Sequence, residues 1–155
     1  MSQESEELVG GVMTSNLVMV EKDETVRNAV SLMVRRNSSC LIVVSSERAV
    51  GIVTESDLVL KVLFTNTNTS KVLIGDVMST PLITISPEAK ISDAAEKMVE
   101  YQVTKLVVVD EGGRTVGLIA ASDLARVEAQ KKNYADLTLN AIARMKRSGT
   151  GGPYE

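Results

Sequence analysis

The sequence contains no histidine and no tryptophan, and its single cysteine is Cys40. The absence of histidine removes the commonest general base and the commonest metal ligand of proteins. With only one cysteine in addition, the chain lacks the usual ligands of a zinc site, and no internal disulfide can form. We therefore expect no metal centre and no required cofactor. We expect Cys40 to be a small buried hydrophobic residue. A chain with a single cysteine is also typical of a reducing compartment.

Aromatic residues make up only 3% of the chain, whereas apolar residues make up 44%. The core is therefore expected to be aliphatic. The net charge of −3 argues against a general nucleic-acid binder, which needs a basic surface to neutralise phosphates. No apolar run reaches the ~20 residues that cross a bilayer, and the acidic N-terminus lacks the layout of a signal peptide. These features predict a soluble cytoplasmic protein without a membrane partner.

The sequence repeats itself internally. Gly10-Gly11-Val12-Met13-Thr14 matches Gly75-Asp76-Val77-Met78-Ser79 at an offset of 65 residues. The offset becomes 66 at Gly51 and Gly117, because the turn at residues 110–113 is one residue longer in the second copy. A repeat sustained over about fifty residues, with its one insertion in a turn, indicates an internal duplication.

Both copies predict the same order of elements, β-α-β-β-α. A short strand (17–20, then 82–85) precedes an amphipathic helix, and two apolar strands (40–44 with 50–53, then 106–109 with 116–119) lead to a second helix. Ser86 as N-cap and Pro87 as first helical residue predict the start of the first helix in the second copy. The apolar residues of these helices recur at i, i+3, i+4 and i+7: Val26, Ala29, Val30 and Met33, then Ile91, Ala94, Ala95 and Met98.

One unit of about sixty residues has a marginal core by itself. We therefore expect an α/β (α+β) fold in which two β-α-β-β-α units pack through their sheets around a pseudo-two-fold axis. The predicted segments are a polar N-terminal segment (1–9), the first repeat (10–64), a linker (65–74), the second repeat (75–128), a helical extension (129–148) and a flexible tail (149–155).

A heptapeptide present in both copies, residues 51–57 and 117–123, marks the candidate site. Each copy runs from a strand into a helix, so its final residue, Asp57 or Asp123, lies in the first helical turn near unpaired N–H groups. Such a turn also attracts phosphate, and a carboxylate can accept one hydrogen bond per oxygen from a vicinal diol. Thr54 followed by Asp57 also fits a helix cap that needs no ligand. Ala120 cannot form that cap with its side chain.

The two copies together resemble tandem CBS domains, the regulatory repeat named after cystathionine β-synthase. The resemblance covers about residues 10–128 and rests on residues 12–14 and 77–79, the apolar strands 41–44 and 106–110, and the two heptapeptides. It implies two β-α-β-β-α repeats joined through their sheets, with a cleft on either side of the pseudo-two-fold axis. It also implies adenosine-containing ligands, namely AMP, ADP, ATP or S-adenosylmethionine.

The resemblance implies roles for the residues of both heptapeptides. In the family, the last aspartate binds both ribose hydroxyls, and a threonine or serine three residues earlier helps to bind phosphate. These roles fall to Asp57 and Thr54 in the first copy. In the second copy Asp123 fits the pattern but Ala120 departs from it, so Ser122 or backbone N–H groups would have to bind phosphate there.

Four further residues are candidate ligand contacts. Lys105 matches a basic residue that the family often has before this strand, whereas its counterpart Cys40 does not, so the two clefts are expected to be unequal. Lys105 is otherwise a solvated strand end, and Ser39 is either a turn residue or a ligand contact. Ile83 and Thr84 precede a helix and could offer backbone groups to a base edge.

These observations favour a stand-alone regulatory module that binds an adenosine-containing ligand and signals through an effector protein or a homodimer. The alternative is a ligand-free structural scaffold, which Ala120 supports. Nucleic-acid binding through the basic residues of 126–147 is disfavoured by the acidic balance of the chain. An enzyme is not expected, because no Walker loop, histidine or nucleophile–base pair is visible.

Overall fold

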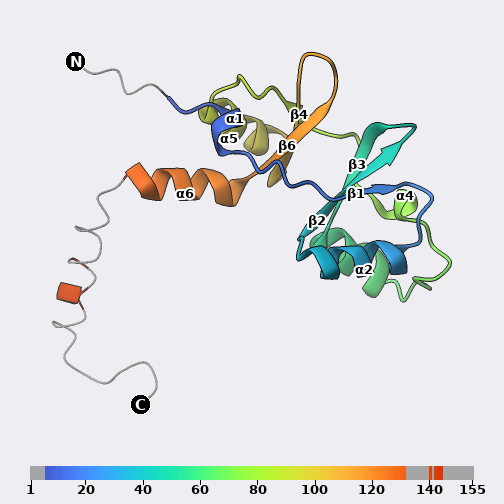
Figure 1. Cartoon of the computed structure of the whole chain (residues 1–155). Helices are drawn as coiled ribbons and strands as arrows, with labels where there is room; N and C mark the ends of the chain where they lie inside the picture. Colours follow the sequence, from blue (N-terminus) through green and yellow to red (C-terminus); the bar gives the residue numbers. More distant parts are fainter. Residues whose placement is uncertain (1–5, 132–139, 141, 145–155) are drawn as a thin grey trace.

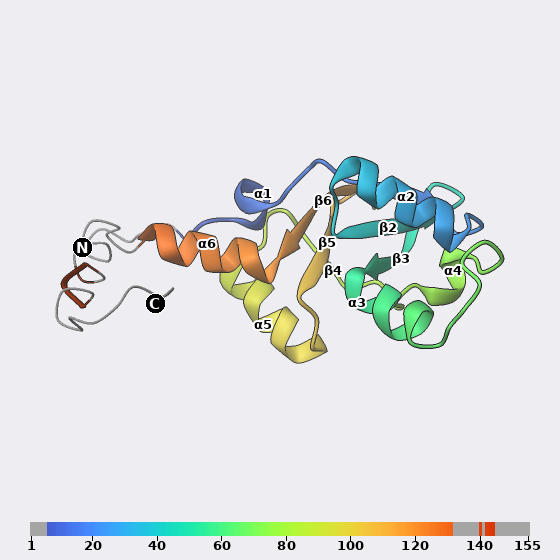
Figure 2. The same cartoon turned by 90° about the horizontal axis from the view of Figure 1, so that it is seen from below.

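The computed structural model describes residues 6–131, 140 and 142–144. It contains two three-stranded sheets, and the two halves of the molecule lie side by side (Figures 1 and 2). In chain order the elements are α1 (Val9–Val12), β1 (Met19–Glu21), α2 (Val26–Arg36), β2 (Cys40–Ser45), β3 (Arg48–Thr54), α3 (Glu55–Leu58), the π-helix η1 (Val59–Leu63), α4 (Ile74–Val77), β4 (Thr84–Ile85), α5 (Ile91–Tyr101), β5 (Lys105–Val109), β6 (Thr115–Ala120) and α6 (Ala121–Lys131).

The two sheets have the same topology and the same irregularity. In the first sheet β1 runs parallel to β2, and β3 pairs with β2 in antiparallel orientation. Strands β4, β5 and β6 repeat this arrangement. The register shifts between Val43 and Val44 of β2, and between the equivalent Val108 and Val109 of β5. A bulge at the same point of both sheets fits the predicted duplication.

The inner faces of the two sheets pack against each other. Cys40 and Ile42 of β2 form one buried cluster with Val107 of β5 and Leu118 of β6. Burial raises the pKa of the Cys40 thiol above its usual value, so the thiol stays protonated within this aliphatic layer. The cluster confirms the predicted α+β fold in which the two units pack through their sheets.

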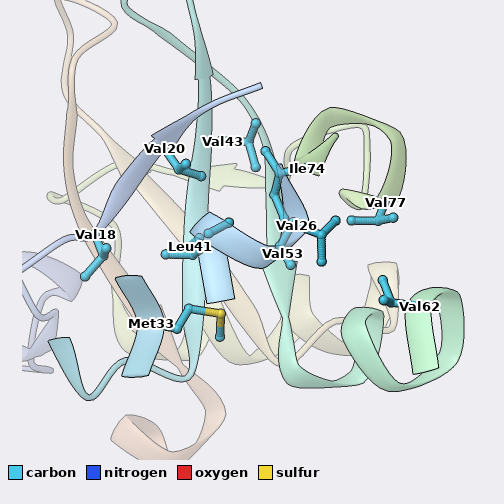
Figure 3. Close-up of a cluster of buried hydrophobic side chains, with 11 residues drawn as sticks. Val18, Val20, Val26, Met33, Leu41, Val43, Val53, Val62, Ile74 and Val77 are labelled. Carbon is cyan, nitrogen blue, oxygen red and sulfur yellow. The ribbon is translucent and has the colours of Figure 1, made fainter. Parts of the chain in front are cut away.

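Helices cover the outer face of each sheet. Figure 3 shows the cluster of the first half, in which Val26 and Met33 of α2 lie near Leu41 of β2 and Val53 of β3. The second half repeats this packing, with Met98 of α5 in the corresponding cluster. The apolar stripe predicted from the helical period faces the core in α2, whereas in α5 Ala94 and Met98 are buried but Ala95 is exposed.

The two repeats exchange their first helices. By sequence α1 belongs to the first repeat, yet Val9 is buried in the cluster of the second half. Conversely, α4 belongs to the second repeat, but Ile74 and Val77 are buried in the cluster of the first half (Figure 3). Figure 1 shows α1 in the half that contains β6 and α6, which it contacts, and α4 beside the first sheet in the other half. A packing unit of the fold is therefore not one continuous repeat.

Main-chain hydrogen bonds hold the exchanged helices at equivalent points. The N–H groups of Val9 and Gly10 donate to the carbonyls of Ala89 and Pro87, each at 2.8 Å. A Cβ atom on Gly10 would lie 3.0 Å from the Pro87 carbonyl oxygen, so glycine permits this close approach. The other half repeats the arrangement: the Ile74 N–H donates to Glu24 at 2.7 Å and the Gly75 N–H donates to Lys22 at 2.9 Å.

The start of α5 differs from the prediction. Ser86 is not its N-cap and Pro87 is not its first residue, because the helix begins at Ile91 with Lys90 as N-cap. The carbonyls of Pro87 and Ala89 accept hydrogen bonds from the exchanged α1. These residues therefore form a turn that receives α1, and a helix through them would direct the same carbonyls along its own axis.

Other boundaries differ from the prediction or lie outside the described residues. Strands β1 and β4 are shorter than predicted, because Leu17 and Leu82 precede them and pack between the sheets. Residues 140 and 142–144 of the predicted extension 129–148 are helical, but most of that extension beyond Lys131, and the tail 149–155, lie outside the described residues. No helix in the described part of the chain is both long and apolar enough to span a membrane.

Candidate functional site

Asp57 lies where β3 ends and α3 begins. The extended backbone of Thr54 ends the strand and serves as the N-cap of the helix. The Asp57 carboxylate oxygen Oδ2 accepts the Thr54 N–H at 2.9 Å, and the Thr54 hydroxyl accepts the Asp57 N–H at 3.4 Å. This reciprocal pair is a capping box, the ligand-free arrangement that the sequence also allowed. It sets the position of the carboxylate at the start of the helix.

The carboxylate of Asp57 also joins two segments that are distant in sequence. Its Oδ1 oxygen accepts the Ser79 hydroxyl at 2.7 Å and lies 3.0 Å from the Lys61 ammonium. Lys61 belongs to η1, and its ammonium donates a second bond to the carbonyl of Val77 at 3.0 Å. Ser79 follows α4 and belongs by sequence to the second repeat. Asp57 is only 8% exposed, so these donors replace the water that a buried carboxylate has lost.

The charge state of Asp57 follows from these contacts. Burial by itself raises the pKa of its carboxyl group, because a low dielectric disfavours the charged form. The Thr54 N–H, the Ser79 hydroxyl and the Lys61 ammonium favour the charged form, and together they lower the pKa below its ordinary value. Asp57 is therefore ionised at neutral pH and can only accept hydrogen bonds.

A cleft of about 340 Å³, which we name the Asp57 cleft, lies between the repeats. Thr54, Asp57 and Ser79 line one part of it, and Thr104 and Lys105 of the second repeat line another. The structure thus brings together three of the predicted residues, Thr54, Asp57 and Lys105. Among the described residues Lys105 forms no salt bridge. One carboxylate, one free ammonium and several hydroxyls can together bind sugar hydroxyls and an anionic group.

The second heptapeptide is built differently. Oδ2 of Asp123 accepts the Ala120 N–H at 2.8 Å, but Ala120 has no hydroxyl to complete a capping box. The other oxygen of Asp123 pairs with the guanidinium of Arg126 in the same helix. The hydroxyl of Thr14, which corresponds to Ser79, forms no hydrogen bond with Asp123 in the part of the chain that the structure describes. The two aspartates therefore have different partners.

A second cleft, of about 260 Å³, contains Ser39, and we name it the Ser39 cleft. Cys40 lines this cleft where Lys105, its counterpart, lines the Asp57 cleft. The charged side chain that lines it is Arg36, and Asp123 is not part of its lining. The two clefts therefore differ in charge as well as in volume.

The remaining predicted residues lie elsewhere. Thr84 lines a separate hollow, and its carbonyl accepts the Lys97 ammonium at 2.6 Å. The carbonyl of Ile83 accepts the Val107 N–H at 3.1 Å, while its side chain packs against the second-half core. Ser122 is exposed at the start of α6. The structure does not bring these residues to the Asp57 cleft, and both carbonyls already have protein donors.

Several residues of this site were not predicted from the sequence, among them Lys61, Ser79 and Gln102. Lys61 lies four residues after Asp57, a spacing that places two side chains on one helix face and could have been noticed. Ser79 lies 22 residues from Asp57, and no local pattern connects them. Gln102 lines the cleft with φ of 54° at the C-cap of α5, where glycine is the usual signal. Within the described ranges, no group of three or more acidic or cysteine side chains could hold a metal ion.

Two similar units joined through their sheets, with unequal clefts between them, define a tandem-repeat module. The model of the CBS domain family matches residues 9–63 and 74–130, which is more than half of the chain. The chain therefore belongs to the CBS domain family and carries a tandem pair of these domains.

Several known proteins are similar to this chain. The uncharacterized protein MK0525 of Methanopyrus kandleri is 31% identical over 121 residues, which cover 77% of this chain and 62% of that protein. Homoserine O-acetyltransferase of Methanococcus vannielii is 36% identical over 121 residues, 77% of this chain but only 24% of the enzyme. The chain thus spans less than two thirds of both relatives, and the second likeness brings no acetyl-transfer activity with it.

A solved structure shows the same fold with ligands. The CBS domain pair of protein MJ0100, crystallised in complex with 5′-methylthioadenosine and S-adenosyl-L-methionine, matches with a TM-score of 0.73 and 26% identity. The match covers 82% of this chain and 99% of that one.

Proposed function

We propose that this chain is a regulatory module that binds an adenosine-containing compound in the Asp57 cleft. The observation that carries the proposal is that two charged groups face the same cleft. They are the buried, ionised carboxylate of Asp57 and the ammonium of Lys105, which has no ion-pair partner among the described residues. The carboxylate would accept both ribose hydroxyls, while Lys105 and the Thr54 hydroxyl would bind phosphate. The adenosine compounds bound to the similar CBS pair of MJ0100 support this ligand class.

AMP, ADP, ATP and S-adenosylmethionine all contain the ribose that Asp57 would bind. Asp123, with Ser122 or backbone N–H groups beside it, would form a second site. This site would be weaker, because Arg126 already occupies one oxygen of the Asp123 carboxylate. Ser39 would contribute to the other cleft. The protein would act in the cytoplasm.

The signal would pass to a second copy of the chain or to an effector protein. Four apolar side chains of η1 and its C-cap support the homodimer: Val59, Leu60, Leu63 and Phe64 are 52%, 65%, 75% and 84% exposed. An uncharged patch can meet its own copy across a two-fold axis without repulsion. Exposed apolar patches of this kind mark interaction sites. We therefore take this patch, named the η1 patch, as the face that binds the second copy.

A ligand-free scaffold is the second candidate function. The observation that favours it is that both carboxylate oxygens of Asp57 already accept hydrogen bonds from the protein. Under this alternative Asp57 caps α3 and ties the repeats together, and no compound enters the cleft.

Calorimetric titration with AMP, ADP, ATP and S-adenosylmethionine separates the two candidates. We expect at least one compound to bind, and at a hundred times its Kd to stabilise the protein against unfolding by about 2.7 kcal/mol. Asp57→Asn removes the charge at nearly constant volume and should abolish binding at the Asp57 cleft. Asp123→Asn, at the equivalent position of the second repeat, is the matched control and should retain it. If the wild type binds none of the four compounds, the scaffold is the better description.

A further inference from the structure

We infer that Ser79 and Lys61 form a latch that competes with the ligand for the Asp57 carboxylate. Ligand binding is then coupled to release of Ser79 from the Asp57 carboxylate of α3. This inference rests on the proposed function, because it takes Asp57 as the group that binds the ribose. It adds the step by which occupancy of the cleft changes a contact between the two repeats.

The Asp57 carboxylate has a limited number of acceptor sites. A carboxylate offers about four sites for hydrogen bonds. At Oδ2 of Asp57 the donors are the Thr54 N–H at 2.9 Å and the Thr54 hydroxyl at 3.2 Å. At Oδ1 the donors are the Ser79 hydroxyl at 2.7 Å and the Lys61 ammonium at 3.0 Å. All of these sites are in use, so a diol with two O–H donors must displace two protein donors.

The donors to Asp57 differ in how freely they can leave its carboxylate. The Thr54 N–H belongs to the backbone at the helix start, so it cannot leave Oδ2 unless the cap of α3 opens. The Thr54 hydroxyl also donates to Oδ2, and turning it toward a phosphate frees one site there, so the other ribose hydroxyl still needs a site on Oδ1. Ser79 and Lys61 donate from side chains that turn about single bonds, and both bind the same oxygen. Displacing this pair frees two sites on Oδ1 at once. A ribose can therefore bind there while the capping box stays closed.

The latch holds residues 77–79 in place on the first half. The Lys61 ammonium bonds simultaneously to Asp57 and to the carbonyl of Val77, at the C-terminal end of α4. Ser79 also forms main-chain bonds with Ile52 at the edge of β3, at 2.8 Å and 3.3 Å. When a ligand takes Oδ1, the side-chain bonds of Ser79 and Lys61 to Asp57 break and the main-chain bonds remain. The segment from the second repeat is then held less tightly on the first half.

The second repeat lacks an equivalent latch. The counterpart of Lys61 is Val127, a buried apolar residue of α6. Asp123 is paired instead with Arg126 of its own helix, and among the described contacts the Thr14 hydroxyl does not reach it. Coupling between ligand binding and the contact between repeats therefore belongs to the Asp57 cleft alone.

The test measures ligand affinity in variants that weaken the latch. Ser79→Ala and Lys61→Met are titrated with AMP, ADP, ATP and S-adenosylmethionine in a calorimeter. Each variant should bind the compound about tenfold more tightly than the wild type, because the free protein loses a bond to a charged group that the complex does not contain. Thr14→Ala, at the position equivalent to Ser79, is the matched control and should leave the affinity of the Asp57 cleft unchanged.

The outcomes separate the latch from the function on which it rests. A purely structural Ser79 would lower the melting temperature without tightening binding. If the wild type binds, Asp57→Asn does not, and the latch variants bind equally or more weakly, the latch is wrong and the proposed function stands. If the wild type and both latch variants bind none of the four compounds, both proposals are wrong.

Discussion

Among the residues that the structure describes, Asp57 is the only polar or charged one that is buried. A buried charge is tolerated only when donors replace the lost water, and removing one partner of such a pair is costly. Thr54, Ser79 and Lys61 supply those donors. The same contacts that make Asp57 a good acceptor at neutral pH therefore also make it part of the stability of the fold.

The lowered pKa of Asp57 predicts a contribution to stability that depends on pH. Its stabilising effect is fully present above the unfolded-state pKa of about 3.9 and is lost as pH falls through the lower folded-state pKa. In denaturant titrations from pH 7 downward, the free energy of unfolding of the wild type should fall more steeply below about pH 5 than that of Asp57→Asn. Other carboxylates contribute equally to both proteins, so the difference isolates Asp57, and parallel curves would contradict the prediction.

At the scale of elements, the main feature is the exchange of α1 and α4. Each is a helix of only four residues, too short to be stable by itself. Each is instead held by burial in the opposite half and by main-chain bonds to a turn there. Both exchanged segments then pair with a strand edge, α1 through Thr14 with Leu118 and α4 through Ser79 with Ile52. The exchange adds a second connection between the repeats besides the sheet-to-sheet layer.

Two adjacent glycines of α1 test the importance of this docking. Gly10→Ala places a Cβ atom 3.0 Å from the Pro87 carbonyl oxygen, which cannot retreat without stretching its bond to the Gly10 N–H. We expect a loss of about 1–3 kcal/mol of unfolding free energy. Gly11→Ala is the matched control, since its nearest neighbour outside the helix is the Glu7 side chain at 3.9 Å. It should be neutral or gain up to ~1 kcal/mol from helix propensity. Equal effects in denaturant unfolding would argue against tight docking.

At the scale of the whole molecule, the halves differ most on their outer surfaces. The η1 patch exposes four apolar side chains on the first half. The positions equivalent to Leu60, Leu63 and Phe64 on the second half are occupied by Arg126, Ala129 and Gln130. The duplicated fold is therefore nearly symmetric inside and asymmetric outside, and only one half offers this apolar face to a second copy.

Phe64→Glu tests the homodimer. We expect the wild type to elute as a dimer and the variant as a monomer in size-exclusion chromatography with light scattering, because two buried glutamates would face each other across the two-fold axis. The melting temperature of the monomer itself should change little, since Phe64 is 84% exposed. Val34→Glu is the control, because it places the same charge at an exposed residue of α2 outside the η1 patch, and this variant should remain dimeric. A monomeric wild type would rule out this interface.

The sequence by itself was enough to show the duplication, the β-α-β-β-α order of each repeat and most of the buried faces of α2 and α5, but not the four-residue helices α1 and α4. These properties depend on local patterns: short continuous apolar runs for the strands, a helical period of 3.6 and repeated spacing. The contact between Thr54 and Asp57 could also be predicted from the sequence, because both residues lie in one helix cap. The packing of the sheets followed from the size of a single unit, which is too small for a core of its own.

Other properties were decided only by the tertiary structure. The exchange of α1 and α4 turned Pro87 and Ala89 into a docking turn and moved the start of α5 to Ile91. The same exchange brought Ser79 onto the Asp57 carboxylate. The physical reason is that a hydrogen bond or a buried contact is satisfied by whichever group lies nearest in space, and residues far apart in the chain leave no local signature of that meeting.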